Sequence, residues 1–402
     1  PLVLGTGITI GSMSGIVLGQ GATAAYNIPG FSATFTDTLY IRSSTVATLT
    51  GNLTVRGITI DSAASGFVAG ANTVSLGAGG FSMTVAAAYV TSLSGGSWTV
   101  TGSWTNSSTS ASWSFAAPIT FNAGANQTMT FAGTNLTGNE FDAVTFNSTA
   151  AITYTMATRG LRLGGALSIT DTLTTVGLTT SNLAVTAGSV TIGTNGTLTA
   201  GSSTITVSGN FNFSAGTFTY GTSTVVFAAN GTITSPGASD TTYTYNVTVN
   251  VSVTLTLGAR FGINNVLNMG NSSTITGAFY LDLQVAGGQV NPLVLGTGVS
   301  LTGINGFTFG NDAVVGYNVP AATYAQVYIR SQVATLQGNM TVTYLEIVSS
   351  FVAAGNTVTV TASASVNIAA GGYITSTSGG SWTVSGTWTN ASTSASWSFA
   401  AP

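Results

Sequence analysis

Apolar and hydroxyl-bearing residues alternate along most of the chain. Stretches such as Ser203–Ser208 and Thr217–Tyr220 place a large apolar residue at every second position. A period of two directs one set of side chains inward and the other outward, which is typical of a half-buried β-strand. Glycine, Asn-Gly and Gly-Ser turn signals follow about every 8 to 12 residues. The pattern predicts short strands and no amphipathic helix, because Gly, Thr and Ser interrupt every candidate helix.

Two long stretches of the chain are nearly identical. Gly95–Pro118 reads GGSWTVTGSWTNSSTSASWSFAAP, and Gly379–Pro402 repeats it with changes only among small residues. We call them the first and the second tryptophan block, because together they contain all six tryptophans. The passages that precede them also match, starting from PLVLGTG at Pro1 and at Pro292. Repetition on this scale indicates a tandem array.

The repeat divides the chain into three predicted parts. Residues 1–118 are the C-terminal-type piece of a long unit and end in the first tryptophan block, residues 119–291 are the remainder of the unit, and residues 292–402 start the next unit by repeating 1–118. Two β-strand sub-repeats occupy 119–291, where Val144–Asn147 is echoed by Val247–Asn250. We expect the natural chain to continue beyond both ends of this sequence.

Short strands in tandem fit two architectures. In a parallel β-solenoid, or β-helix, each turn pairs with the next about 4.8 Å along the axis. A string of β-sandwich domains would also accept sub-repeats of about a hundred residues. We favour the solenoid, because no linkers separate the sub-repeats and their lengths vary as loops do. At about 25 residues per turn, the chain would make roughly 16 turns.

Two phrases resemble a known family. AGTFTYGTSTVVF at Ala215–Phe227 and TYNVTVNVSVTLTLG at Thr244–Gly258 are similar to the β-strand-repeat cell-surface proteins of bacteria and archaea, which are haemagglutinin- or adhesin-like. The resemblance covers most of residues 95–290 and is weaker elsewhere. It implies a parallel β-helix, an extracellular location and a structural or adhesive role, and it brings no catalytic residue and no cofactor.

The chain is unusually poor in charge. Only 4% of its residues are charged, its six basic residues are all arginine, and it contains neither histidine nor cysteine. Ordinary domains carry about 25% charged residues. A net charge of −3 argues against nucleic-acid binding, which needs clustered cations. No apolar run approaches the ~20 residues of a membrane span, so we expect no membrane-spanning helix in this segment. Such a surface suits packing against copies of the same chain or a covering of glycans.

The acidic residues give little support for catalysis. They are scattered along the chain as Asp37, Asp61, Glu140, Asp142, Asp171, Asp240, Asp282, Asp312 and Glu346. Glycan hydrolysis needs two paired acids. Glu140 with Asp142 is the one close acidic pair, and Arg159 with Arg162 the one close basic pair. For these we predict ion pairs between turns. We predict no catalytic residue, no cofactor and no metal site, and hence a protein that is not an enzyme.

The tryptophans are candidates for a core layer or for a contact surface. They are Trp98, Trp104, Trp113, Trp382, Trp388 and Trp397. Trp98 with Val100, and Trp113 with Phe115, share a strand face with an apolar partner, which favours the core. Trp104 follows Gly102 and has polar neighbours, so it is the best candidate for exposure, for subunit contact or for stacking on a sugar.

Asparagine supplies the candidate modification sites. Asn-x-Ser/Thr sequons are frequent, and those at Asn52 and Asn106 recur at Asn339 and Asn390. We take these four as candidate glycosylation sites. Glycans would add the solubility that the few charges do not provide.

These observations predict a non-enzymatic, extracellular structural segment of a filament, fibre, sheath or adhesive stalk. It would act by stiffness and by self-association, as a homopolymer or through lateral bundling, with surface glycans as a further candidate partner. The alternative is a carbohydrate-binding or glycan-cleaving β-helix of a surface adhesin. An exposed groove lined by Trp104 and acids on adjacent turns would favour that alternative.

Overall fold

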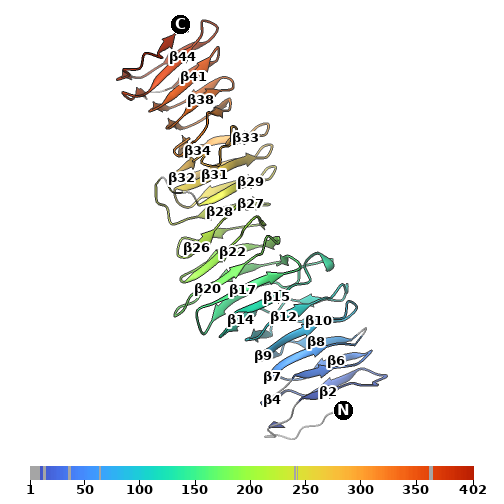
Figure 1. Cartoon of the computed structure of the whole chain (residues 1–402). Coiled ribbons are helices and arrows are strands. Elements are labelled where there is room, and N and C mark those ends of the chain that lie inside the picture. Colours follow the sequence, from blue (N-terminus) through green and yellow to red (C-terminus); the bar gives the residue numbers. More distant parts are fainter. Residues whose placement is uncertain are drawn as a thin grey trace. The chain divides into compact units, whose positions relative to one another are not determined.

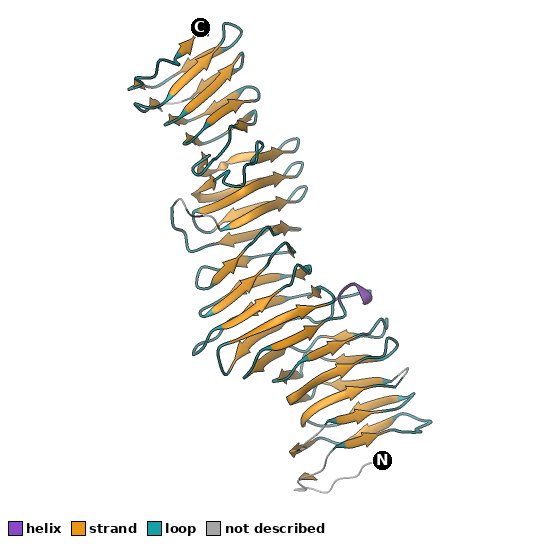
Figure 2. Cartoon of the chain, in the orientation of Figure 1, coloured by secondary structure: helices purple, strands orange, loops and turns teal. Residues whose placement is uncertain are grey.

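The protein is all-β and coils into a parallel β-solenoid of about 17 turns, with 53% of its residues in strands and 1% in helix (Figures 1 and 2). The predicted fold class is confirmed, and the β-sandwich alternative is not favoured. The turn count is close to the roughly 16 turns expected at about 25 residues per turn. The computed structural model describes residues 10–11, 15–34, 38–62, 65–239, 241, 243–361 and 365–402. Asp37 and Asp240 lie outside these described residues.

The chain divides into two compact units, and each has its own architecture. Unit 1 consists of Pro1–Thr206 with Ala215–Thr219, and unit 2 of Val207–Ser214 with Tyr220–Pro402. Within each unit, strands pair in parallel with strands one turn away, so that residues of like position stack in columns.

Unit 1 contains one 3-10 helix, η1 (Gly133–Asn135), among its described residues. Its strands are β1 (Ile10–Gly11), β2 (Ile16–Leu18), β3 (Tyr26–Ile28), β4 (Phe31–Thr34), β5 (Leu39–Ile41), β6 (Val46–Leu49), β7 (Leu53–Ile60), β8 (Gly66–Gly70), β9 (Thr73–Met83), β10 (Tyr89–Ser92), β11 (Ser97–Val100), β12 (Trp104–Asn106), β13 (Ser114–Phe115), β14 (Ile119–Ala123), β15 (Gln127–Thr130), β16 (Val144–Ser148), β17 (Ile152–Ala157), β18 (Leu161–Arg162), β19 (Ala166–Ile169), β20 (Val176–Thr179), β21 (Val185–Ala187), β22 (Ser189–Ile192), β23 (Gly196–Thr199) and β26 (Thr217–Thr219).

The boundary between the units falls within β24 (Thr204–Val207). The strands of unit 2 are β25 (Phe211–Asn212), β27 (Thr224–Phe227), β28 (Gly231–Thr234), β29 (Thr244–Val249), β30 (Thr254–Leu257), β31 (Phe261–Met269), β32 (Thr274–Leu283), β33 (Leu293–Leu295), β34 (Ser300–Phe309), β35 (Tyr317–Val319), β36 (Ala322–Thr323), β37 (Gln326–Ile329), β38 (Val333–Leu336), β39 (Met340–Val342), β40 (Tyr344–Ile347), β41 (Ser350–Ala354), β42 (Thr357–Val360), β43 (Val366–Ile368), β44 (Tyr373–Ser376), β45 (Ser381–Val384), β46 (Trp388–Asn390) and β47 (Ser398–Phe399).

The alternating sequence pattern sets the inside and the outside of each turn. Across β16, β19 and β22, the paired residues Val144, Leu167 and Val190 are all buried. Their neighbours Thr145 and Thr191 lie on the outer face of the same strands. Aliphatic side chains therefore stack on aliphatic side chains in the interior, and hydroxyls on hydroxyls outside. The described residues contain no helix that is long and apolar enough to cross a bilayer.

Asparagine side chains help to hold successive turns together. The Oδ1 atom of Asn52 accepts a hydrogen bond from the backbone N–H of Thr73, and that of Asn339 accepts one from Thr357, each at 2.9 Å. The same bond to the following turn, at 2.8 to 3.0 Å, is made by Asn126, Asn182, Asn210, Asn230 and Asn271. These bonds satisfy backbone donors near the start of a strand.

Candidate functional site

The first tryptophan block lies inside unit 1. Trp98 on β11 is 1% exposed, Trp104 on β12 is 0% exposed, and Trp113 is 8% exposed. Trp104, the best candidate among them for exposure, is a core residue instead, because it is covered from both sides. Its strand pairs with β9 on the preceding turn, where Trp104 lies beside Phe81, and with β15 on the following turn, where it lies beside Met129.

A glycine lets the backbone bring Trp104 against the preceding turn. Gly80 has φ +62°, and a Cβ atom there would lie 2.0 Å from the carbonyl oxygen of Ser103. Only a residue without a side chain fits this approach in this backbone conformation. The next residue, Phe81, stacks on the indole of Trp104 with ring centroids 4.2 Å apart. Phe141, from the following turn, meets the same indole at 5.2 Å.

A buried glutamate closes this aromatic cluster. Glu140 is 0% exposed. Its Oε1 accepts hydrogen bonds from Trp104 Nε1 at 3.2 Å and from Asn106 Nδ2 at 2.7 Å. Its Oε2 accepts from the backbone N–H of Ala132 at 2.8 Å and of Gly133 at 3.4 Å. All four partners donate, which suits a carboxylate because it can only accept. We call this arrangement the Glu140 site.

The backbone of Glu140 adds a further bond, because its carbonyl oxygen accepts from Trp113 Nε1 at 2.7 Å. Both tryptophans that flank Asn106 in the block therefore donate to one residue of the following turn. Sequence reasoning identified the tryptophans as a cluster but did not connect them to Glu140. No spacing rule links the two, since the acid lies in the irregular segment after η1 (Gly133–Asn135).

The predicted ion pairs between Glu140, Asp142, Arg159 and Arg162 are not formed. Glu140 faces the interior, and Asp142 is exposed. Arg162 Nη1 donates instead to the carbonyl oxygen of Leu136 at 2.9 Å, and the Arg159 guanidinium lies 3.2 Å from the side-chain amide of Asn135. The prediction was wrong because residues 140–142 do not form a regular strand, so an i, i+2 pair does not share a face.

Burial controls the protonation of Glu140. It raises the pKa of the carboxyl group from 4.5 to about 7, and the hydrogen bonds from Asn106, Ala132, Trp104 and Gly133 oppose this rise. A perturbed carboxyl group is a common feature of catalytic sites. Here, however, the carboxylate is sealed from solvent and all its contacts are to the protein.

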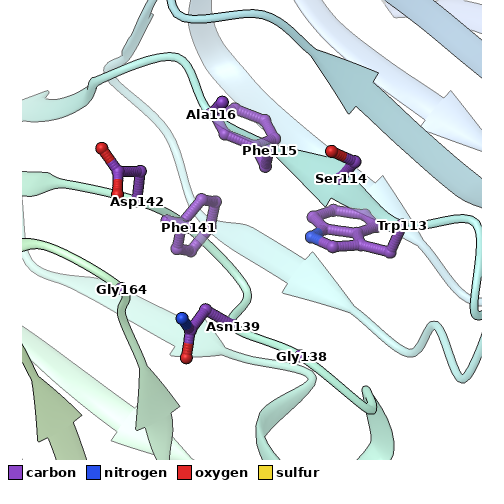
Figure 3. A pocket seen from close by; sticks show the side chains of 9 residues that line it. All are labelled: Trp113, Ser114, Phe115, Ala116, Gly138, Asn139, Phe141, Asp142 and Gly164. Atoms are coloured by element: carbon purple, nitrogen blue, oxygen red, sulfur yellow. The ribbon is translucent and has the colours of Figure 1, made fainter.

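The surface next to the Glu140 site carries a shallow open cavity of about 280 Å³. Figure 3 shows the side chains that line it, among them Trp113, Asn139, Phe141 and Asp142. Asp142 is the acidic residue of this lining, and the carboxylate of Glu140 does not reach it. Two-carboxylate glycan hydrolysis needs both acids at one site. This cavity therefore has one of the two carboxylates that the reaction needs.

Acidic clusters of a kind that could hold a metal ion do not form anywhere in the part of the chain that the structure describes. Asp171, for example, is buried and accepts hydrogen bonds from Ser148, Leu173 and Thr174. Its Oδ2 atom joins it to Ser148 on the preceding turn, and its Oδ1 atom accepts from the backbone of the residues that follow it.

The second tryptophan block repeats the internal geometry of the first. Trp382 and Trp388 lie 5.6 Å apart at 71°, and Trp397 stacks on Phe399 at 18°. The corresponding pairs of the first block meet at 75° and 17°. In this structure the side chain of Trp388 is 37% exposed.

The four candidate glycosylation sites fall into two groups. Asn52, Asn339 and Asn390 are exposed. Asn106 is 0% exposed, and its Nδ2 atom, to which a glycan would be attached, donates to Glu140. The folded first block therefore has no room for a glycan at Asn106.

Protonation of Glu140 gives a testable pH dependence. Because the pKa is raised on folding, the contribution of Glu140 to stability is complete below about pH 4.5 and is lost as the pH rises to about 7. A shift of this size corresponds to a free energy on the order of 3 kcal/mol. The chain has two glutamates, Glu140 and Glu346. In protein with ¹³C-labelled glutamate, the Glu346→Gln variant should leave a single carboxyl resonance that titrates near pH 7. A midpoint near 4.5 would contradict the assignment.

Comparisons with protein-family models, with curated proteins and with solved structures give no match for this chain.

Proposed function

We propose that the protein is a structural, non-enzymatic segment of an extracellular filament, fibre, sheath or adhesive stalk, and that it works through stiffness and self-association. One observation carries this proposal: buried polar side chains and charged side chains both form hydrogen bonds or ion pairs between consecutive turns. Ladders of backbone hydrogen bonds along the axis join each turn to the next and resist its separation, and side-chain bonds between turns reinforce them.

Charged residues follow the same rule as the buried ones. The guanidinium of Arg42 pairs with Asp61 at 2.9 Å, and that of Arg260 pairs with Asp282 at 2.7 Å. In each pair the partners are about one turn apart, at sequence separations of 19 and 22 residues. Because the charges are neutralised in place, they leave little net repulsion between neighbouring molecules.

Exposed valines on unit 2 offer a surface for self-association. Val290, Val314, Val315 and Val333 are between 38% and 64% exposed. They lie on neighbouring turns: the N–H of Asn318 donates to the Val290 carbonyl, and β35 (Tyr317–Val319) pairs with β38 (Val333–Leu336). Apolar groups gathered on a nearly uncharged surface favour association. We call these four residues the valine patch.

Self-association should depend on the valine patch. We expect sedimentation velocity of the 402-residue protein to show a concentration-dependent shift to larger species, and negative-stain microscopy to show bundles or filaments. Val314→Asp, at a position 64% exposed, should shift association at least tenfold in concentration without unfolding the chain. The matched control is Leu173→Asp, since Leu173 is 88% exposed on unit 1 outside the patch. Monomers at every concentration would overturn the self-association proposal.

The glycan-cleaving alternative has little support. The groove that would favour it required an exposed Trp104 with acids on adjacent turns, and Trp104 is buried.

A further inference from the structure

Three tyrosine rings form a row on the outer face of unit 2. Measured between ring centroids, Tyr280 on β32 lies 5.8 Å from Tyr328 on β37, and Tyr328 lies 5.5 Å from Tyr344 on β40. These are distances of direct aromatic contact. All three residues are partly exposed, so molecules in the surrounding water can reach them.

The strand register explains why Tyr328 meets Tyr344. β37 (Gln326–Ile329) pairs with β40 (Tyr344–Ile347) on the following turn, so that Gln326 lies beside Tyr344 and Tyr328 lies beside Glu346. The two tyrosines are therefore diagonal neighbours on one outward face, a spacing that aromatic side chains can bridge. Their rings are tilted by 50° to each other.

Hydrogen bonds orient the phenol groups of this pair. Tyr344 donates to Oε2 of Glu346 at 3.0 Å, and Tyr328 donates to Oε1 of Gln326 at 2.7 Å. Burial and the bond to Glu346 raise the pKa of the Tyr344 phenol, so the hydroxyl is protonated at neutral pH. A tyrosine that loses an electron also loses this proton, and the Glu346 carboxylate is in place to accept it.

The composition excludes two common covalent links between side chains. The chain contains no cysteine, so it forms no disulfide, and no lysine, so it forms no amide bond between a lysine amine and a side-chain carboxyl group. It does contain 13 tyrosines. Oxidative coupling of two tyrosines is a cross-link that this composition allows.

We propose that Tyr328 and Tyr344 are a site of oxidative cross-linking, at which a peroxidase with hydrogen peroxide joins the two rings into dityrosine. Each phenol gives up one electron and its hydroxyl proton and becomes a phenoxyl radical. The radicals form a bond between the ring carbons next to the two hydroxyls, and the hydrogens on these carbons move to the oxygens. One hydrogen peroxide takes up the two electrons and two protons and leaves as two water molecules.

Such a bond would join consecutive turns of unit 2 covalently. It deepens the proposed structural role, because it adds to the hydrogen bonds that resist the separation of turns, and it rests on that role for the supply of an extracellular oxidant. The coupling itself needs only the folded unit 2. Cross-linking is therefore measured separately from self-association, which depends on the valine patch.

Tyr280 and Tyr328 are less suited to the same reaction. Both hydroxyls donate to one amide oxygen, Gln326 Oε1, at 3.2 and 2.7 Å. An amide oxygen is a much weaker base than a carboxylate, so neither phenol of this pair has a partner that takes up its proton. We therefore place the bond between Tyr328 and Tyr344, where oxidation begins at Tyr344.

The two copies of the repeat differ at this site. Tyr40 pairs with Thr59 in the first copy as Tyr328 pairs with Glu346 in the second, so Gly57 and Thr59 occupy the positions of Tyr344 and Glu346. The second copy thus contains both the additional ring and the carboxylate that accepts its proton.

The test is treatment of the folded 402-residue protein with a peroxidase and hydrogen peroxide, followed by unfolding and digestion with trypsin. Trypsin cuts after Arg330, which lies between the two tyrosines, so an unmodified chain releases residues 261–330 and 331–402 as separate peptides. We expect the two peptides to stay joined, with a mass two hydrogen atoms below their sum and with the fluorescence of dityrosine. Before digestion, the product should have the mass of one chain less two hydrogen atoms.

Conservative variants locate the bond. Tyr344→Phe and Tyr328→Phe keep the rings but lack a phenol, and each should abolish the joined peptide. Tyr373→Phe is the matched control, because Tyr344 and Tyr373 are the two tyrosines of residues 331–402. It should cross-link as the wild type does. Circular dichroism melting of each variant checks that the fold is retained.

Contrary outcomes are distinct from one another. Separate peptides after oxidation of the wild type would overturn the proposal, as would a joined peptide that persists in Tyr344→Phe. Dityrosine confined to residues 261–330 would assign the reaction to Tyr280 and Tyr328 instead. A product with the mass of two chains would show coupling between copies and would contradict a bond within unit 2.

Discussion

Trp104→Ala should destabilise the turns around the first tryptophan block by about 3–5 kcal/mol, the usual range for truncating a buried aromatic side chain. The indole is 0% exposed and is enclosed by Phe81 from the preceding turn and Phe141 from the following one. Its removal leaves a cavity between three turns. It also leaves Glu140 with one fewer hydrogen-bond donor.

The matched control is Trp388→Ala in the second tryptophan block. In the 402-residue protein, Trp388 has nearly the same sequence neighbours but is 37% exposed, so its loss there should cost about 1 kcal/mol. A long solenoid need not unfold in one step, so local hydrogen exchange is the suitable measurement. Exchange in β12 (Trp104–Asn106) and β14 (Ile119–Ala123) should rise about a hundredfold or more in Trp104→Ala. Equal effects of the two substitutions would show that burial by the following turn does not stabilise the block.

The fold could be predicted because its information is local. Alternation of apolar and hydroxyl residues, as in Thr204–Val207 and Thr217–Thr219, specifies which face of each strand is buried, and both segments are strands. The tandem repeat then favoured stacking over separate domains. Every turn has to bury one face of its strands, so the alternation of apolar and hydroxyl residues that describes one strand describes most of them.

The asparagines show that an Asn-x-Thr pattern can indicate either a glycosylation site or a turn whose asparagine bonds to the following turn. Asn52 and Asn339 stood out as sequons, but each also accepts a backbone hydrogen bond from the following turn. The Thr two positions later belongs to the strand that follows the turn. An Asn-x-Thr phrase therefore arises from turn geometry alone, and only the structure separates Asn106, which is buried, from the exposed candidates.

The Glu140 site and the contact between Tyr280 and Gln326 could not be predicted, because both depend on which residues meet between turns. Partners such as Asn106 and Glu140 are 34 residues apart, and Tyr280 and Gln326 are 46 apart. Loops of variable length separate them, so a shift of one residue would change every pairing. The tryptophans recur together because they pack within one block, whereas Glu140 belongs to the turn that follows the block.

The second large effect concerns Glu140→Gln. Four donors converge on the carboxylate, and an amide offers one oxygen and a nitrogen that cannot accept. In either orientation of the amide, two donors lose their acceptor inside the protein. Each buried donor left without a partner costs about 1–3 kcal/mol. Removal of the buried charge offsets part of this cost above about pH 7, so we expect a net loss of about 1–3 kcal/mol. Asn106 cannot compensate by rotating its own amide, since its Oδ1 already accepts from Ser108.

Asp142→Asn is the control for this substitution, because it makes the same chemical change two residues away at an exposed position. We expect it to change the free energy of unfolding by no more than about 0.5 kcal/mol. Hydrogen exchange of β12 and β15 (Gln127–Thr130) measures both variants. A double-mutant cycle with Asn106→Ala then isolates the bond between the two side chains, and a coupling of about 1 kcal/mol or more is expected for contacting residues in one network. If Glu140→Gln behaved like Asp142→Asn, the buried carboxylate would not hold the following turn against the tryptophans. The stiffness of this part of unit 1 would then come from the backbone hydrogen bonds between turns and from the aromatic contacts alone.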